Sequence, residues 1–110
     1  MKTRALALDP QVMDAIVARI VAAAQPLRII VFGSAARGEM GQDSDVDLLV
    51  VMPEGTHRRR TSQFLHTQLF GIPAAVDIVV ATPGDLERHG DHPGLIYQAA
   101  LHEGREVYAA

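Results

Sequence analysis

The chain has 110 residues with ten basic and thirteen acidic side chains, a slight negative balance that argues against a large electrostatic footprint for nucleic acid. The absence of cysteine excludes disulfides, thiolate metal sites and a cysteine nucleophile. No apolar run approaches the roughly 20 residues that a membrane helix needs, and the first residues lack the apolar stretch of a signal peptide. We therefore expect one cytoplasmic domain over residues 1–110, with no membrane partner.

A helix and then a buried strand are expected at the start of the chain. Asp9 can cap free N–H groups, and Pro10 suits the first helical position, so the helix should run from there to about Ala24. Residues 27–32 form a branched, apolar run that ends at Gly33, a pattern typical of a buried strand followed by a turn. A short helix is expected over about residues 35–39.

The remaining elements follow the same alternation of helix and strand. Strands are predicted over residues 45–52 and 74–81, with a helix over about residues 56–70 between them. Residues 83–85 are interpreted as a turn before a last helix over about residues 92–103. The side chains of the middle helix that are expected to face the core are Phe64, Leu65, Leu69 and Phe70.

Three aspartates in apolar strands are the most informative residues of the chain. Asp45 and Asp47 lie two positions apart in a strand, so they share a face with backbones roughly 6.6 Å apart, and Asp77 comes from another strand. Unpaired carboxylates in apolar surroundings cost several kcal/mol or shift their pKa until neutral, so an energetic reason for three of them is expected. A divalent cation would resolve their repulsion, and oxygen ligands with substrate phosphates favour Mg²⁺. If two ions bind, one can hold a triphosphate while the other activates an attacking hydroxyl.

The turn at Gly33 and Ser34 provides the other half of that chemistry. Glycine allows close approach of the backbone to a phosphate, and the start of the following helix would offer free N–H groups. The Ser34 hydroxyl can add a hydrogen bond. Neither a Walker A motif nor a dinucleotide-binding glycine fingerprint is present.

These motifs, Gly33-Ser34-x-Ala36-Arg37-Gly38 followed by Ser44-Asp45-x-Asp47-Leu48 and a later strand aspartate, resemble the minimal nucleotidyltransferases of the DNA polymerase beta superfamily. The resemblance implies an α/β (α+β) fold with a mixed sheet flanked by helices. It also implies transfer of a nucleoside monophosphate from a nucleoside triphosphate to a hydroxyl, with release of pyrophosphate. The implied substrate is ATP and the implied cofactor is Mg²⁺, as two ions.

Site roles carry over from the resemblance position by position. Gly33 and Ser34 would bind the triphosphate, and Arg37 would either contact phosphate or pin the loop through hydrogen bonds to the acids. The implied metal-binding and catalytic residues are Asp45, Asp47 and Asp77, and Asp77 would complete the site and assist as a base.

Small stand-alone members of this family often resemble antitoxins encoded beside a HEPN-domain ribonuclease, which some silence by attaching AMP to a tyrosine of the toxin. Members with a small-molecule acceptor generally carry a further domain, so the expected acceptor here is a partner protein. Two alternatives stay open. One is an antitoxin that neutralises its partner by binding alone, and the other is an enzyme that adds nucleotides to a nucleic-acid 3′ end, which the negative balance and few aromatic residues disfavour.

One basic run, His57-Arg58-Arg59-Arg60, stands apart from these motifs. It is interpreted either as a solvated helix start or as a docking patch for an acidic partner or a nucleotide tail. Sequence alone leaves both interpretations open.

Overall fold

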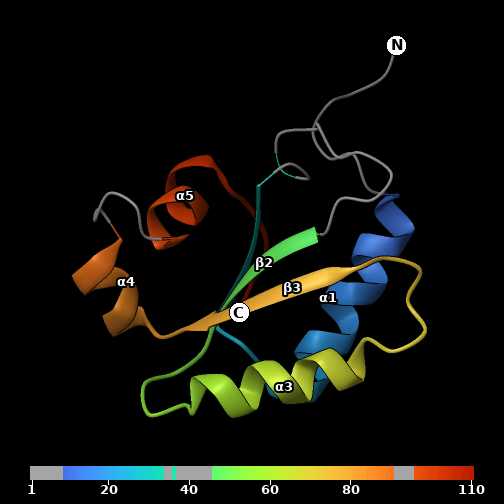
Figure 1. The fold of residues 1–110 in the computed structure, drawn as a ribbon, viewed down its shortest axis with the longest axis horizontal. Coiled ribbons are helices and arrows are strands. Elements are labelled where there is room, and N and C mark those ends of the chain that lie inside the picture. Colours follow the sequence, from blue (N-terminus) through green and yellow to red (C-terminus); the bar gives the residue numbers. More distant parts are fainter. Residues whose placement is uncertain (1–8, 34–35, 37–45, 91–95) are drawn as a thin grey trace.

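The structure is a computed structural model that describes residues 9–33, 36, 46–90 and 96–110. Its elements, in chain order, are α1 (Pro10–Ala24), β1 (Arg28–Phe32), β2 (Val46–Val51), α3 (Arg58–Gln68), β3 (Val76–Ala81), α4 (Pro83–His89), α5 (Ile96–Glu103) and β4 (Arg105–Ala109) (Figure 1). The helix expected over residues 35–39 lies, apart from Ala36, outside the described residues. Within those residues, no helix combines the length and the apolar character that a bilayer crossing requires.

The strands of the described residues form one mixed sheet in the order β3-β2-β1-β4. β1 pairs antiparallel with both β2 and β4, whereas β2 and β3 run parallel. A parallel pair needs a crossover connection, and α3 is that crossover. The predicted α+β fold, with a mixed sheet flanked by helices, is confirmed.

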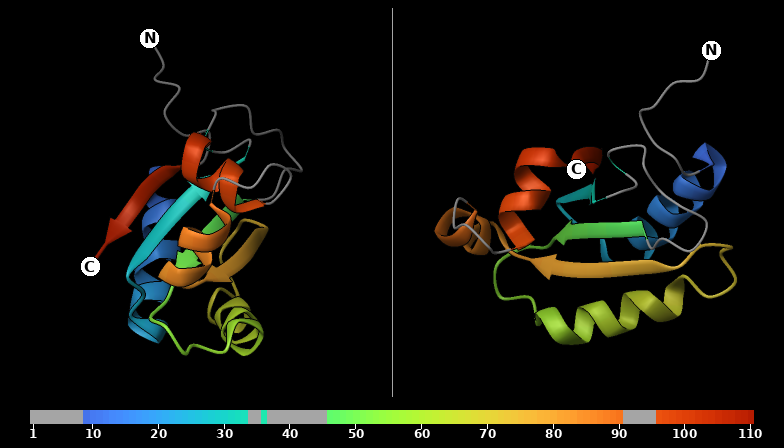
Figure 2. Two further views of the ribbon diagram at one scale, coloured as in Figure 1. Left: turned by 90° about the vertical axis from the view of Figure 1, so that its left-hand side faces the viewer. Right: turned by 45° about the horizontal axis from the view of Figure 1, so that its top comes forward.

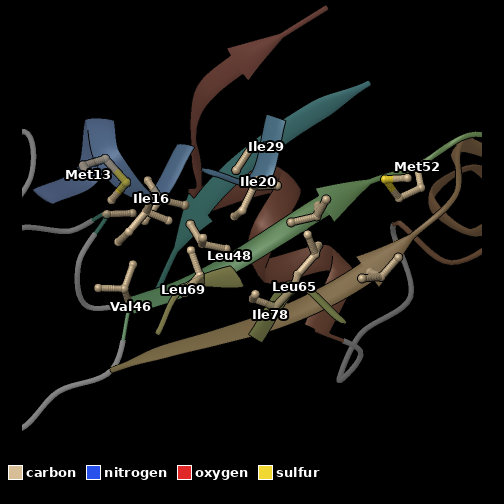
Figure 3. Packing of buried hydrophobic residues seen from close by; sticks show 14 residues of the cluster. Met13, Ile16, Ile20, Ile29, Val46, Leu48, Met52, Leu65, Leu69 and Ile78 are labelled. Carbon is tan, nitrogen blue, oxygen red and sulfur yellow. The ribbon is translucent and has the colours of Figure 1, made fainter. Parts of the chain in front are cut away.

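Helices cover both faces of this sheet. α1 and α3 lie on one face, and α5 lies on the other (Figure 2). The larger core forms between the sheet and the first two helices, where Ile16, Leu48 and Leu65 are fully buried (Figure 3). A smaller core on the opposite face joins Leu49 and Val51 of β2 to Ala100 of α5. The central strand β2 is therefore buried on both faces.

The sequence signals at the first helix are confirmed in detail. The Asp9 side chain accepts a hydrogen bond from the Gln11 backbone N–H at 2.8 Å, and Pro10 occupies the first helical position. The chain leaves the helix at Gln25, which adopts a left-handed backbone conformation with φ 51°. Pro26 follows, so the helix cannot continue.

Two elements were not expected from the sequence. Residues 83–89, interpreted as beginning with a turn, form α4 instead, because Thr82 and Asp85 make a reciprocal capping box and Pro83 fits the first turn. The second unexpected element is the edge strand β4. Its partner β1 lies more than 70 positions away in the sequence. Between these two strands, Arg28 Nε donates to Glu106 Oε2 at 2.6 Å.

The expected inward side of α3 is partly wrong. Leu65 and Leu69 are buried as predicted, but Phe64 is 48% exposed and Phe70 is 88% exposed. The helix ends at Gln68, so Phe70 lies beyond it and does not share its inward face.

Candidate functional site

Asp47 and Asp77 lie side by side at one end of the parallel pair β2 and β3. They are register partners, so their α-carbons occupy neighbouring positions on strands about 4.8 Å apart. The alternation of each strand places both side chains on the face that α5 covers further along, together with Leu49 and Val79. Asp47 is half-buried and Asp77 is exposed. The sheet register therefore brings together Asp47 and Asp77, two of the three acids predicted for the site.

Gly33 directly follows β1 and lies against the carboxylate of Asp47. Its backbone has φ +73°, a left-handed conformation that favours glycine. A Cβ atom at this position would collide with Asp47 Oδ2 and lie 3.4 Å from Asp47 Cγ. The positive φ favours glycine here, and any larger residue would force the Asp47 carboxylate to move.

Two side chains of α3 hold the outer edge of β3 on either side of Asp77. The Ser62 hydroxyl donates to the Ile78 carbonyl at 3.1 Å, and His66 Nε2 lies 3.2 Å from the Val76 carbonyl oxygen. Both carbonyls point away from β2, so these contacts satisfy an otherwise open sheet edge. Sequence analysis missed this role, because a helix period does not reveal which polar side chains meet a strand edge.

The other predicted site residues, Asp45, Ser34 and Arg37, lie outside the described residues. Among the residues that the structure describes, no group of three or more potential metal ligands occurs. The arrangement seen directly is therefore the Asp47–Asp77 pair with Gly33 beside it.

The family profile described as nucleotidyltransferase domain matches residues 15–107, which include Gly33 and both described acids. The chain belongs to this nucleotidyltransferase family. Nucleotidyl transfer is accordingly the activity that the domain supports. No curated protein matches the sequence significantly.

A solved structure supports the fold of this nucleotidyltransferase domain. A Sulfolobus solfataricus protein assigned as a nucleotidyltransferase superposes with a TM-score of 0.61 at 20% sequence identity. The match covers 90% of this chain and 78% of the other. At that identity the likeness concerns the arrangement of helices and strands.

The donor atoms of the nucleotidyltransferase site suit a divalent cation. Asp47 and Asp77 contribute carboxylate oxygens from adjacent strands, and two like charges at neighbouring sheet positions repel unless something neutralises them. Hard oxygen ligands favour Mg²⁺ over softer metals. The pair therefore fits the cation that this family's use of nucleoside triphosphates implies.

Proposed function

We propose that this nucleotidyltransferase transfers AMP from ATP to a hydroxyl of a partner protein in the presence of Mg²⁺, as the antitoxin of a HEPN toxin-antitoxin pair. The observation that carries the catalytic part is the Asp47–Asp77 register pair beside Gly33, within a nucleotidyltransferase domain. ATP, AMP and the HEPN partner rest on the resemblance of the sequence motifs to minimal nucleotidyltransferases.

In the proposed reaction the acceptor hydroxyl oxygen forms a bond to the α-phosphorus of ATP, and the bond from that phosphorus to the bridging oxygen of the β-phosphate breaks. Pyrophosphate leaves, and the hydroxyl proton passes to a carboxylate, for which Asp77 is our candidate because it is the exposed member of the pair. Asp45, Asp47 and Asp77 would hold Mg²⁺, which when bound neutralises phosphate charge and lowers the pKa of a coordinated hydroxyl.

Nucleotide binding is assigned to the turn after β1. Gly33 brings the backbone of this turn against the Asp47 carboxylate, so a triphosphate bound at the turn would lie beside that acid. The roles of Ser34 and Arg37 stay predictions: Ser34 would donate its hydroxyl to phosphate, and Arg37 would contact phosphate or hold the loop.

A protein acceptor is supported by apolar side chains that the fold leaves in solvent. Phe70 is 88% exposed and Phe64 is 48% exposed, and aromatic residues are enriched where proteins meet. An apolar hollow of about 610 Å³ also lies between α1 and β4, beside Val17 and Val107.

The test is the intact mass of the neighbouring gene's product, co-purified and incubated with this protein, Mg²⁺ and each nucleoside triphosphate in turn. A gain of one or more AMP units with ATP, absent with Asp45→Asn and Asp47→Asn, is expected. Glu87→Gln serves as the matched control, because Glu87 is an exposed acid on α4, beyond the opposite end of the parallel strands.

Other outcomes separate the alternatives. A stable complex without any mass gain, together with an Asp77→Ala variant that still neutralises the partner in cells, would establish an antitoxin that acts by binding. Extension of an RNA or DNA primer without protein modification would establish the 3′-end activity instead.

A further inference from the structure

A polar hollow of about 570 Å³ lies at the opposite end of the sheet from Asp47 and Asp77. It is lined by residues 54–59 together with Thr82 and Arg88, and we name it the arginine pocket. β2 and β3 both point toward α4 in Figure 2, so the arginine pocket lies beyond their carboxyl ends while the two aspartates lie near their starts. About 13 Å of strand separates Asp47 from Val51, the last residue of β2.

Two arginines of the arginine pocket come from different helices and are held by one buried carboxylate. Arg58 Nη1 lies 3.1 and 2.9 Å from the two Asp85 carboxylate oxygens, and Arg88 Nη2 lies 3.2 Å from Asp85 Oδ1. The Asp85 side chain is only 8% exposed, whereas those of Arg58 and Arg88 are 54% and 63% exposed. The carboxylate thus fixes both guanidinium groups from beneath while they stay open to solvent.

Asp85 is in turn fixed by the start of α4. Its Oδ2 accepts from the Thr82 backbone N–H at 3.0 Å, and its own N–H donates to Thr82 Oγ1 at 3.2 Å. Burial opposes ionisation of this carboxyl, but the hydrogen bonds from Thr82 and Arg58 and the Arg58 charge outweigh it, so the pKa of Asp85 lies below its ordinary value. The anchor is therefore charged near neutral pH.

The arginines keep most of their donors after binding Asp85. A guanidinium group has five N–H donors in a planar fork, and Asp85 contacts a single nitrogen of each group. Arg59 is a third arginine among the lining residues.

The charges around the arginine pocket favour an anion. The three arginines 58, 59 and 88 carry three positive charges against the two negative charges of Glu54 and Asp85, which leaves one net positive charge. The Glu54 carboxylate lies against the start of α4, where it accepts a hydrogen bond from the Gly84 backbone N–H. Phosphate, with several oxygens on one centre, can accept from more than one guanidinium at once.

We propose that the arginine pocket binds the phosphate group of a small phosphorylated ligand, at a site separate from that of nucleotidyl transfer. Free phosphate, pyrophosphate and a nucleoside monophosphate share the chemistry that these arginines recognise. The proposal does not depend on the nature of the acceptor or on catalysis.

Calorimetric titration of the full chain with each of inorganic phosphate, pyrophosphate and AMP, without divalent metal, tests this proposal. Saturable binding of at least one of the three is expected. Arg59→Gln and Arg88→Gln should each weaken it about tenfold, the effect of losing one charge-assisted hydrogen bond. The probe that binds most tightly identifies the source of the phosphate group.

Arg60→Gln is the matched control. Arg60 belongs to the same helix turn and carries the same charge as Arg59, but it does not line the arginine pocket. Equal losses from Arg59→Gln and Arg60→Gln would show a general charge effect and overturn the proposal. Thermal melting of each variant confirms that it is folded.

Asp47→Asn separates the two sites. If this variant binds phosphate as the unchanged protein does, the arginine pocket is independent of the transfer site, whatever the transfer assay shows. If Asp47→Asn changes phosphate binding in either direction while Arg88→Gln preserves it, the phosphate lies at the transfer site and the proposal is wrong.

Discussion

Asp47 of β2 and Asp77 of β3 occupy the same register level of a parallel strand pair, with Gly33 pressed against the first of them. Neighbouring like charges in a sheet repel each other, and a cation bound between the two carboxylates would relieve that repulsion. Residues that weaken the fold but create a concentrated negative site are typical of functional positions. The pair therefore predicts that substitution affects activity far more than stability.

Replacing either acid should separate catalysis from folding. Asp47→Asn and Asp77→Asn are expected to lower nucleotidyl transfer at least about 100-fold, because a charged ligand to the metal is lost. Their melting temperatures should stay within a few degrees of the unchanged protein, since repulsion is relieved. Pyrophosphate release and thermal melting measure the two effects, and a fully active variant at either position would exclude the mechanism.

Magnesium should stabilise the protein through the same acids. A ligand that binds only the folded state raises stability by about 2.7 kcal/mol at a hundredfold excess over its dissociation constant. Calorimetry with increasing Mg²⁺ should show a rising melting temperature for the unchanged protein and a smaller rise for Asp77→Asn. A larger rise in melting temperature for Asp77→Asn than for the unchanged protein would show that Asp77 does not bind the metal.

Gly33→Ala should damage the site through both backbone and space. Gly55 provides a control with a similar backbone, since its φ is +89° but no atom lies within 4 Å of the position its Cβ would take. Gly55→Ala should cost about 1 kcal/mol from backbone strain alone. Gly33→Ala should cost more and also reduce transfer, because its methyl group displaces the Asp47 carboxylate. Equal effects of the two variants on activity would contradict this account.

Acid should weaken the protein partly through Asp85. Because its pKa is lower in the folded state than in the unfolded chain, the stabilisation is present above about pH 4 and is lost as the pH falls through the folded pKa. Asp85→Asn should reduce the free energy of unfolding by about 1–2 kcal/mol at pH 7, and less at pH 3. Denaturant unfolding at both pH values measures this, with Thr82→Ser as a control that keeps the capping hydroxyl. If the difference in unfolding free energy between Asp85→Asn and the unchanged protein is the same at both pH values, the ionised Asp85 does not stabilise the fold as described.

Adjacent residues of α3 offer a direct test of its orientation. Leu65→Ala should cost about 2–5 kcal/mol, because the side chain is fully buried between helix and sheet. Phe64→Ala should change stability by less than about 0.5 kcal/mol despite removing a larger side chain, because Phe64 is 48% exposed. Chemical denaturation compares them, and similar losses would mean that the two side chains are buried alike.

Local patterns predicted most of the fold and the strand face on which Asp47 lies. The cap at Asp9, the apolar strands and the two-residue period that places Asp47 with Leu49 all depend on neighbours in the sequence. Such signals predict a helix or strand correctly where the residues of that element are enough to determine its secondary structure. The identity of the family followed from motif spacing around Gly33 and Asp47.

Other features depend on contacts that no local pattern contains. β4 has two charged residues and one strongly β-forming pair, and it becomes a strand only by pairing with β1. α4 was not predicted because Pro83 and Gly84 are common in turns. The capping box of Thr82 and Asp85 is the sequence signal that indicates a helix there. The arginine pocket likewise needs α3 and α4 to meet across Asp85. The pairing of β4 joins residues that are distant in the chain. The arginine pocket depends on a buried carboxylate that contacts side chains from two helices.

The burial of β2 on both faces has a consequence for motion. Amide hydrogens in such a strand exchange with solvent mainly when the whole domain unfolds, whereas those of edge strands exchange through smaller openings. Leu48 to Val51 have no side chain more than 2% exposed, and Asp47 is continuous with them. The carboxylate assigned to metal binding is thus carried by the strand that we expect to exchange most slowly, so its position should persist through the smaller openings of the edge strands.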